Sequence, residues 1–512
     1  MEIIRFSKEI TTYPRREWVK KMALFGIVLS AVPSNLFAIG KKKKNQWLLA
    51  TVSNKNNNPL PINKSIPFDW NYAEIPSDGE GLKLTWSINE KDLGVKNLYL
   101  RISSATDIRE DVSITVVLAK SRMVIAKFKM DFAHYFQPFQ ILIQPEYQHQ
   151  VFSEGVFLTK TIGVKPLWIL IGNDNKTPEI LSPHLFLSNS FKEYNQWKKR
   201  LLSLDSIQTF GWMEGCVLDG IYDCLKKDGE YSKVFITHLN KYFDQNNFFY
   251  EGYNNEKLEN IINNVESLLP FAMLAKANPN HPAIQKAIDF CIYNADENGN
   301  ITDEKNGKRI AKTEECYTVS YPLAMLSTQY NRPELMSLSI STLKYRYQYL
   351  ESDSQVYQRM IIPKDKYFSN WGRGIVWLLL GSVKTIPLLP EGEDKEWLKS
   401  ELKKTVEMVL SLQQDNGLWY CFINDSKTGI ETSGSAGIAA ALAYGYKNGL
   451  LNKKSKEAAH KTWEGLSPYI TADGLLTVSS QVNKGGEILQ RDGFRVISNY
   501  TLGFLGILES AI

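Results

Sequence analysis

The alternation of apolar and polar residues predicts strands in the first part of the chain. Between residue 46 and about residue 190, apolar side chains recur at or near every second position in short runs, which is typical of strands with one buried face. The runs cover residues 82–88, 97–102, 113–118, 124–132, 139–143 and 166–172. Many short strands with no helical period between them predict a β-sandwich domain over residues 46–190.

From about residue 191 onward the period of the apolar residues becomes helical. The expected helices cover residues 190–203, 206–227, 229–244, 257–277, 281–294, 314–329, 332–350, 371–386, 394–413, 433–448, 454–467 and 495–510. Loops join them in pairs, with little strand pattern between them. Paired long helices predict an (α/α)6 toroid of helical hairpins over residues 191–512. The predicted fold class is therefore mainly α, with the toroid preceded by the β-sandwich.

Chemically distinctive residues lie at or near the start of every second predicted helix. If these helices line the inside of a toroid, they run parallel and their first turns surround one mouth. The residues are Trp212, Met213, Glu214, Glu266, Glu314, Glu315, Trp371, Arg373, Trp377, Thr432, Ser433, Ser435, Arg495 and Asn499. This phasing predicts a single pocket at one end of the toroid.

The first 38 residues are expected to form an export signal. Arg15 and Arg16 precede an apolar run at residues 22–32, and the segment ends at Ala38. Paired arginines resemble a twin-arginine signal, and the apolar run is too short to span a bilayer. We therefore expect an exported, periplasmic protein, with membrane association through an uncleaved signal as the alternative.

Composition narrows the function class. The chain has 512 residues with 43% apolar and 22% charged residues, which describes an ordinary globular protein. The net charge of +5 is not gathered into a basic face, so we expect no nucleic-acid partner, whereas mild positive charge suits an acidic substrate. Twelve tryptophans and 25 tyrosines suit carbohydrate stacking, although most aromatic residues belong to cores.

The motifs of several enzyme classes are missing from the sequence. There is no HExxH, GxSxG or glycine-rich phosphate loop, and the six histidines lie outside the predicted pocket stretches. Five scattered cysteines without a CxxC pair do not indicate a disulfide framework. We therefore expect neither a metal nor a cofactor.

Three glutamates are the candidate catalytic acids. Glu315 and its neighbour Glu314 open a predicted helix, where acidic residues are also common for their interaction with the helix dipole. The uncharged, aromatic segment that follows suggests that one carboxylate faces the inside with a raised pKa, and Glu315 is preferred. Glu266 and Glu214 each lie within an apolar run, and a buried ion pair is the alternative role for both.

The candidate sugar-binding residues centre on Arg373, which lies between Trp371 and Trp377. Indole rings stack on sugar faces, and a guanidinium group can bind a carboxylate through two hydrogen bonds. A salt bridge is the alternative for Arg373, and one of the two tryptophans is expected to belong to the core. The remaining candidates are Trp212, Thr432, Ser433 and Ser435. For the last three, helix capping and close packing are the alternative roles.

Three stretches resemble one family in the same order: residues 371–377 (WGRGIVW), 414–420 (QDNGLWY) and 431–436 (ETSGSA). They are similar to signatures of the unsaturated glucuronyl and rhamnogalacturonyl hydrolases of glycoside hydrolase families 88 and 105. The resemblance covers roughly residues 210–510 and implies a six-hairpin toroid that binds a uronic acid at a non-reducing end. It also implies that Arg373 holds the uronate carboxylate and that Trp371 and Trp377 shape the sugar subsite.

Two features depart from that family pattern. The proton-donating Asp of the family is matched by Glu315, one methylene longer, and the N-terminal β-domain is additional. Both features resemble the related β-glucuronidases (family 154-like), which carry a β-sandwich before the toroid and cleave saturated glucuronic acid.

We therefore expect an exported glycoside hydrolase that removes a terminal uronic acid, with glucuronic acid preferred, from a uronic-acid-containing oligosaccharide. Glu315 is the expected proton donor, and Glu266 or Glu214 the base or nucleophile. Three alternatives stay open: an unsaturated uronyl hydrolase acting by vinyl-ether hydration, a polysaccharide lyase, and a non-catalytic glycan-binding protein. The β-domain is expected to dock on the toroid, to form a homodimer or to bind glycan.

Overall fold

The structure is a computed structural model that describes residues 46–53, 60–87, 97–172, 176–188, 195–226, 231–305, 307–352 and 354–512. The predicted export signal at residues 1–38 lies outside the described residues. Within the part of the chain that the structure describes, no helix is both long and apolar enough to cross a membrane. The five cysteines all lie in this part and are free.

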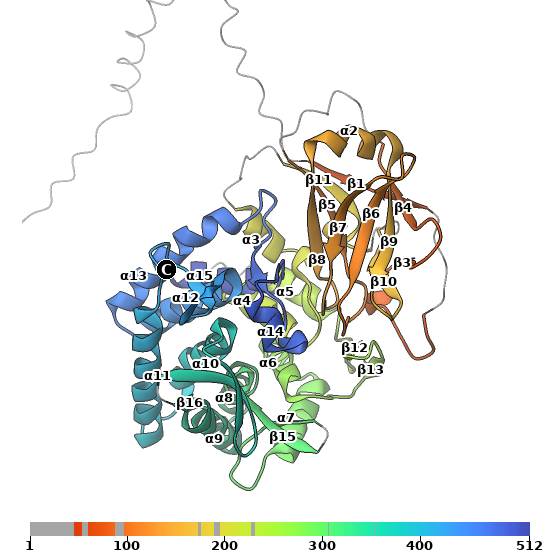
Figure 1. Cartoon of the computed structure of the whole chain (residues 1–512). Coiled ribbons are helices and arrows are strands. Elements are labelled where there is room, and N and C mark those ends of the chain that lie inside the picture. Colours follow the sequence, from red (N-terminus) through yellow and green to blue (C-terminus); the bar gives the residue numbers. More distant parts are fainter. Residues whose placement is uncertain are drawn as a thin grey trace, which may run out of the picture. The chain divides into compact units, whose positions relative to one another are not determined.

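Two antiparallel sheets form most of the N-terminal part (Figure 1). The strands of the first, in spatial order, are β1 (Gln46–Leu49), β11 (His184–Ser188), β5 (Asn97–Ser103) and β8 (Pro138–Ile143). The strands of the second are β2 (Thr51–Ser53), β4 (Leu82–Thr85), β9 (Val156–Ile162), β6 (Ser113–Leu118) and β7 (Val124–Lys129). Alternation explains the burial: Leu82 and Leu84 of β4 are fully buried, whereas Lys83 and Thr85 are not.

Both sheets contribute to one hydrophobic core, which includes Leu100 and Leu185 from the first sheet and Leu84 and Leu158 from the second. A further strand predicted at residues 166–172 is β10 (Leu167–Leu170), which pairs with β3 (Tyr72–Ile75). The predicted strands are thus confirmed where the structure describes them, with α2 (Pro145–Glu154) as an unpredicted helix between β8 and β9.

Six helices contact one another in a closed ring. They are α4 (Trp212–Leu225), α6 (Leu268–Ala277), α8 (Tyr321–Tyr330), α10 (Gly372–Thr385), α12 (Thr432–Lys447) and α15 (Thr501–Ala511). Each contacts the next in this order, and α15 contacts α4. Each also contacts at least one helix outside the ring. In the same order, these outer helices are α5 (Tyr231–Leu239), α7 (Pro282–Asn294), α9 (Pro333–Leu350), α11 (Glu393–Ser411), α13 (Lys453–Leu466) and α3 (Gln196–Leu201).

Burial separates the inner from the outer helices. All 14 residues of α10 are buried, whereas α11 buries a stripe that includes Leu398, Leu402, Val406 and Val409 at spacings of three or four residues. A helix apolar on all sides belongs inside a bundle, and a one-sided helix belongs on its surface. The ring closes between α4 and α15 because Gly220 meets Gly503. A Cβ atom added to Gly220 would lie 2.4 Å from the Cα atom of Gly503.

The helical part contains more strand than the sequence predicts. The helix expected at residues 257–277 begins only at Leu268, because β12 (Phe249–Glu251) and β13 (Lys257–Glu259) form a hairpin before it. Asn255 and Asn260 adopt positive φ values of 62° and 56°, a conformation that asparagine tolerates and that interrupts regular structure. This hairpin leads into ring helix α6.

Further short strands lead into the other ring helices. β15 (Lys308–Lys312), β17 (Gln355–Ile361) and β18 (Asp365–Ser369) share one sheet, in which β15 precedes α8 and β18 precedes α10. β20 (Asp425–Glu431) precedes α12, and β22 (Arg495–Val496) lies before α15. The strands therefore place their residues at the end of the ring where the inner helices begin.

The N-terminal part packs directly on the helical part. Phe68 stacks on Phe136 with ring centroids 5.7 Å apart and meets the ring of Tyr242 edge-on at 5.3 Å. Gln481 Nε2 donates to the carbonyl oxygen of Asp131 at 2.9 Å, and Gln137 Nε2 donates to that of Ile497 at 3.2 Å. The loop between β7 and β8 is thereby tied to the segment that follows β21 (Ser479–Ser480).

Candidate functional site

A cavity of about 400 Å³ lies where the inner helices begin. Its walls come from three sources: the N-terminal ends of α4 and α10 with the segments leading into α6 and α8, the loops after β5 and β7, and residues 482–484. Among the predicted residues that line it are Trp212, Glu266, Glu314, Arg373 and Trp377. The prediction that the first turns of inner helices surround one mouth is therefore met by α4 and α10 and by the segments leading into α6 and α8.

Glu314 is the acid best placed to donate a proton. It follows β15 and precedes the π-helical turn Cys316–Ser320, and its side chain lines the cavity. Gln358 Nε2 donates to both carboxylate oxygens at 2.7 and 2.8 Å, and Asn483 Nδ2 donates to Oε1 at 3.3 Å. Burial, and next the negative charge of Glu266, raise the pKa of Glu314 above its usual value. The protonated form of this carboxyl group is thus favoured.

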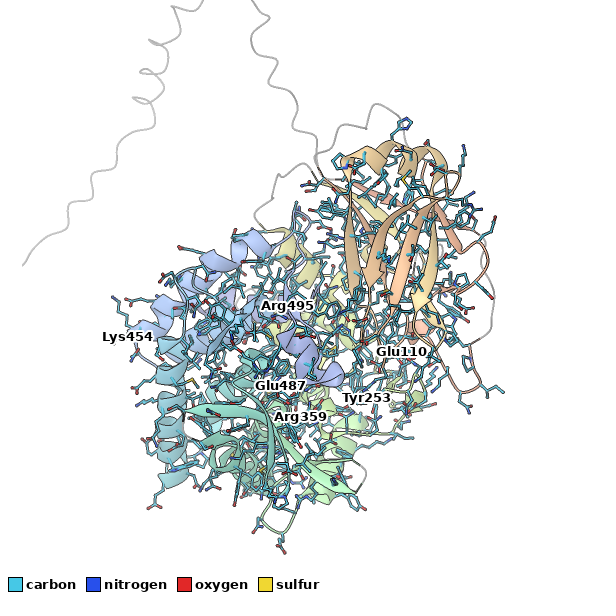
Figure 2. All side chains as sticks on the ribbon, in the orientation of Figure 1. Glu110, Tyr253, Arg359, Lys454, Glu487 and Arg495 are labelled. Atoms are coloured by element: carbon cyan, nitrogen blue, oxygen red, sulfur yellow. The ribbon has the colours of Figure 1, made fainter. Side chains whose placement is uncertain are left out.

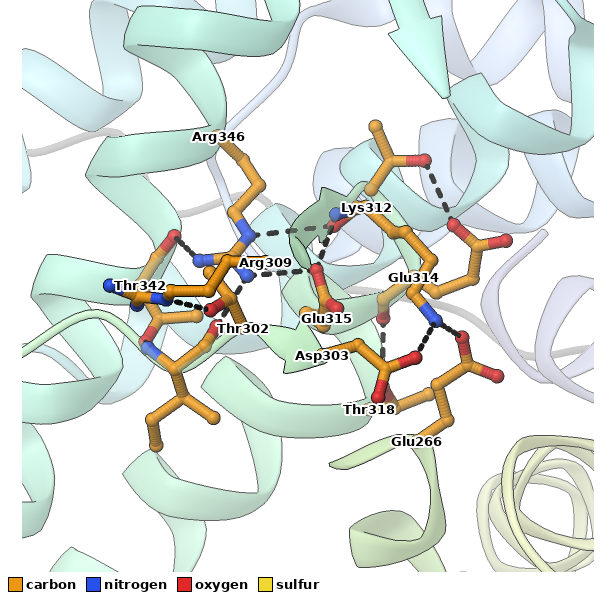
Figure 3. Close-up of polar contacts among 12 residues, drawn as sticks. Glu266, Thr302, Asp303, Arg309, Lys312, Glu314, Glu315, Thr318, Thr342 and Arg346 are labelled. Atoms are coloured by element: carbon orange, nitrogen blue, oxygen red, sulfur yellow. Dashed lines mark hydrogen bonds and ion pairs between the residues drawn. The ribbon is translucent and has the colours of Figure 1, made fainter. Parts of the chain in front are cut away.

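Glu266 shares a cation with a second acid. Lys312 Nζ donates to Glu266 Oε1 and, at 2.9 Å, to Asp303 Oδ2 (Figure 3). Burial opposes the charge on Lys312, but Glu266 and Asp303 raise the pKa of its ammonium group well above the usual range. Glu266 therefore lies in the cavity as one half of an ion pair.

The preference for Glu315 over Glu314 is not supported by their positions. Glu315 is fully buried and is not among the described residues that line the cavity. Its Oε2 accepts hydrogen bonds from the backbone nitrogen of Lys312 at 2.5 Å and from Arg346 Nη2 at 2.8 Å. Figure 3 shows its carboxylate directed toward Arg346, away from that of Glu314. Glu315 thus anchors the segment that carries Glu314.

Glu214 is likewise enclosed by protein. Its Oε1 lies 2.7 Å from His238 Nδ1, and its Oε2 accepts a hydrogen bond from the backbone nitrogen of Gln208 at 2.8 Å. Both side chains are fully buried, and Glu214 is absent from the described lining of the cavity. The alternative that was kept open for Glu214, a buried pair, describes its position better than a catalytic role.

Arg373 lines the cavity but has most of its donors occupied. Nη1 donates to the carbonyl oxygen of Ser480 at 2.8 Å and to Tyr500 Oη at 2.6 Å, and Nη2 donates to the carbonyl oxygen of Gln481 at 2.8 Å. Nε has no partner within the described part of the chain. A two-pronged clamp on a carboxylate, as the family resemblance implies, needs two donors, and Nε–H and the second N–H of Nη2 have no partner among the described residues. The role of Arg373 as that clamp therefore stays a prediction.

The tryptophans divide as expected between pocket and core. Trp377 lines the cavity, stacks on Tyr317 at 6.2 Å and meets the edge of Trp212 at 5.2 Å. Trp371 is 1% exposed, belongs to a separate cluster with Phe368 and supports the guanidinium of Arg373 at 4.5 Å. Trp371 is therefore a supporting residue of the site rather than a wall.

The three hydroxyl residues at the start of α12 are bonded within the protein. Thr432 Oγ1 donates to the carbonyl oxygen of Thr477 at 2.7 Å. Ser433 Oγ donates to Glu431 Oε1 at 2.5 Å, and Ser435 Oγ donates to the carbonyl oxygen of Glu431 at 2.6 Å. These contacts fit the capping and packing alternative, and sugar binding by these hydroxyls is not supported.

Several residues that line the cavity were not predicted as site residues from the sequence pattern. Arg359, on β17, donates from Nε to Gln358 Oε1 at 2.7 Å, and the described residues offer it no acid as an ion-pair partner. Lys484 and Arg109 both bond to Asp107, and Tyr253 lies beside the guanidinium of Arg109 at 4.9 Å. Figure 2 shows Tyr253 and Arg359 with the side chains of their surroundings.

One histidine also lies at the site, contrary to the expectation from the sequence. His134 comes from the loop between β7 and β8 and lines the cavity. Only the packing of the N-terminal part on the toroid brings it there, so no spacing along the chain could have placed it.

Comparison with known proteins identifies the family. The model of Glycosyl Hydrolase Family 88 matches residues 187–504. An unsaturated 3S-rhamnoglycuronyl hydrolase of Formosa agariphila is 32% identical over 137 residues, which are 26% of this chain and 36% of that protein. An unsaturated rhamnogalacturonyl hydrolase of Bacillus subtilis is 33% identical over 73 residues, 14% of this chain and 21% of that protein. The chain thus matches well under two thirds of the length of either relative.

Solved structures share the fold. A possible member of the GH105 family from Salmonella enterica has a TM-score of 0.54 at 17% identity, covering 62% of this chain and 91% of that chain. A family 105 glycoside hydrolase from C. acetobutylicum has a TM-score of 0.53 at 17% identity, covering 63% and 99%. The predicted helical toroid is confirmed at this level, while the six-hairpin count and the β-sandwich stay predictions. Because the family model matches more than half of the sequence, the chain belongs to Glycosyl Hydrolase Family 88.

Proposed function

We propose that the protein hydrolyses oligosaccharides that end in a 4,5-unsaturated uronic acid, with Glu314 as the proton donor. The observation that carries this proposal is the placement of Glu314, buried in the cavity, held by Gln358 and Asn483, and with a pKa raised by burial and by Glu266. Membership of Glycosyl Hydrolase Family 88 and the partial likeness to two unsaturated uronyl hydrolases support it.

The proposed reaction needs one acid. Glu314 gives its proton to C4 of the ring, and the positive charge that develops at C5 is shared with the ring oxygen. The resulting carboxylate of Glu314 then accepts a proton from water while the water oxygen bonds to C5, which restores the acid. The hemiketal formed at C5 opens, and the hemiacetal at C1 expels the remaining oligosaccharide. Net consumption is one water per bond cleaved.

The ion pair of Glu266 favours this chemistry over a two-carboxylate mechanism. A retaining or inverting glycosidase needs a second carboxylate as nucleophile or base. Of the glutamates expected as second carboxylate, Glu266 is the one that lines the cavity, but its carboxylate is bound to the ammonium group of Lys312 and is not free to attack a sugar carbon. In our proposal Glu266 instead raises the pKa of Glu314.

A saturated terminal glucuronic acid is the second candidate substrate. The observation in its favour is that Glu266 and Glu314 line the same cavity, as an acid and a second carboxylate would. A lyase is less well supported: its base would have to be strong, and burial lowers the pKa of His134, a histidine in the cavity, to about 3.

We propose Arg359, rather than Arg373, as the group that binds the uronate carboxylate, because described residues engage one donor of Arg359 and three of Arg373. Its guanidinium lines the cavity beside Gln358, the residue that holds Glu314, and has no acid partner among the described residues. Trp212 and Trp377 supply the aromatic wall of the same cavity. This arrangement would set the carboxylate of the sugar next to the proton donor.

The wider setting belongs to the same proposal. We propose export through residues 1–38 and a catalytic toroid of six hairpins behind a β-sandwich. A homodimer through that sandwich stays a prediction.

Product analysis tests the proposed function. The purified protein is incubated with an unsaturated uronyl disaccharide made by a lyase and, separately, with the saturated glucuronide of the same sugar. We expect loss of the ultraviolet absorbance of the conjugated acid and no release from the saturated compound. Release of glucuronic acid from the saturated compound alone would favour the second candidate, and release from neither would overturn both.

A further inference from the structure

The N-terminal part contributes a histidine with an open nitrogen to the cavity. His134 is 1% exposed, lies in the loop between β7 and β8, and lines the cavity although this loop is far from the ring helices in the sequence. Its Nε2 atom is buried and has no hydrogen-bond partner among the described residues. A buried polar atom without a partner costs free energy, so its presence beside a cavity points to a ligand.

The tautomer of His134 follows from its other nitrogen. Nδ1 lies 2.8 Å from the carbonyl oxygen of Tyr135, which can only accept a hydrogen bond, so Nδ1 carries the proton. Burial lowers the pKa of the imidazole to about 3, and the positive charge of Lys484 acts in the same direction. The ring is therefore neutral at physiological pH, and Nε2 is a hydrogen-bond acceptor.

Arg373 supplies the complementary donor. Arg373 lines the same cavity, and Nε is the one nitrogen of its guanidinium without a partner within the described residues. Two hydrogen-bonded residues connect Arg373 to His134. Arg373 Nη2 donates to the carbonyl oxygen of Gln481, and Gln481 Nε2 donates at 3.1 Å to Gln137 Oε1, which also accepts from the backbone nitrogen of His134 at 3.2 Å. The wall thus offers an acceptor and a donor close together.

A hydroxyl group satisfies both atoms, because it donates one hydrogen bond and accepts another. A carboxylate only accepts, so it would pair with Arg373 but would face the lone pair of His134 Nε2. We infer that His134 and Arg373 together bind one hydroxyl group of the substrate sugar, and that the N-terminal part is thereby one wall of the substrate site. This inference rests on the proposed function, since it names a further contact of the same substrate.

The chain provides a matched control in His184 of β11. His184 is also fully buried, its Nδ1 lies 2.8 Å from the carbonyl oxygen of Ser182, and its Nε2 has no partner in the described part of the chain. Burial lowers its pKa to about 4. It differs from His134 in one respect that matters, because it is not among the described residues that line the cavity.

The test compares His134→Asn, His134→Gln and His184→Asn with the wild type. Asparagine can still donate to the neighbouring carbonyl but has no acceptor at the position of Nε2, whereas glutamine reaches that position. On an unsaturated uronyl disaccharide we expect His134→Asn to raise KM about tenfold, the equivalent of one hydrogen bond, with kcat within about twofold. We expect His134→Gln to recover most of this loss and His184→Asn to leave KM unchanged.

Monodeoxy analogues of the uronic acid show whether His134 and Arg373 bind a substrate hydroxyl or a water molecule. If they bind a substrate hydroxyl, the analogue that lacks it binds equally to the wild type and to His134→Asn. The inference is overturned if His134→Asn has an unchanged KM for the full substrate, or if it binds every deoxy analogue more weakly than the wild type by the same factor. If the wild type cleaves no uronide, the proposed function fails, and the inference is judged from the Kd of a saturated uronide measured by tryptophan fluorescence. Equal Kd values for wild type and His134→Asn, or no binding by the wild type, would then overturn it.

Discussion

Glu314 and Glu315 are adjacent in the sequence, yet their carboxylates lie in different surroundings. That of Glu314 lines the cavity and accepts hydrogen bonds from Gln358 and Asn483. That of Glu315 is enclosed by the backbone of Lys312 and the guanidinium of Arg346. One residue is therefore available to a substrate, and the other holds the segment in place.

Glu315→Gln is predicted to reduce stability more than turnover. The substitution leaves Arg346 buried without its counter-charge, and breaking a buried ion pair in this way costs about 3 kcal/mol. Chemical denaturation should show this loss of unfolding free energy, whereas kcat of the folded fraction should stay within about tenfold of wild type. Loss of turnover at unchanged stability would instead assign the proton donor to Glu315.

The pH dependence of the rate should report the influence of Glu266. Catalysis by a protonated Glu314 declines as the pH rises through its pKa, and the charge of Glu266 raises that pKa. Glu266→Gln should therefore move the alkaline limb of the kcat/KM profile to lower pH. Lys312 acts in the opposite sense, so Lys312→Met should move the limb to higher pH. Shifts of the reverse sign would show that the limb belongs to another group.

Arg359→Ala is predicted to raise KM for a uronide by about 10- to 100-fold, the cost of one charge-assisted hydrogen-bonded contact. Arg359→Lys should recover only part of the loss, because an ammonium group cannot form two parallel hydrogen bonds to a carboxylate. Arg122→Ala is a suitable control, since Arg122 pairs with Glu80 on the surface of the N-terminal part. If Arg359→Ala binds uronides as tightly as the wild type, the carboxylate contact lies elsewhere.

Acid sensitivity should depend on His184. Burial holds its pKa at about 4 in the folded protein, below the value of about 6.5 expected when unfolded, so the unfolded chain binds the proton more readily. Above pH 6.5 the ring is neutral in both states and the shift has no effect on stability. Below pH 6.5 the unfolded chain takes up the proton first, so the folded state loses stability until the pH reaches about 4. Between pH 7 and pH 5 the wild type should lose about 2 kcal/mol of unfolding free energy relative to His184→Asn. Parallel pH curves for the two proteins would contradict the assignment.

The fold followed from the sequence where periodicity carries the information. Buried alternation gave strands such as β4, β5 and β6, and the helical period gave the ring and its outer helices. The hairpin before α6 was missed because local asparagine conformations, rather than apolar spacing, decide that segment. The helix α14 (Gly486–Arg491) was missed because six residues are too few to show a period.

The site was predicted only in part, for a related reason. Helix phasing placed Glu266, Arg373 and Trp377 correctly at the cavity. It could not choose between Glu314 and Glu315, because the π-helical turn that follows them changes the direction in which each side chain points. His134 and Lys484 reach the cavity through packing between parts far apart in the sequence, which periodicity does not record.

The most direct test of the account is the rate at which Glu314→Gln removes the ultraviolet absorbance of an unsaturated uronyl disaccharide, measured beside the wild type and Glu315→Gln. Removing a general acid costs about 10²- to 10⁴-fold in rate. We predict a loss of kcat in that range for Glu314→Gln with an unchanged thermal unfolding curve. Turnover of Glu314→Gln at the wild-type rate would contradict it.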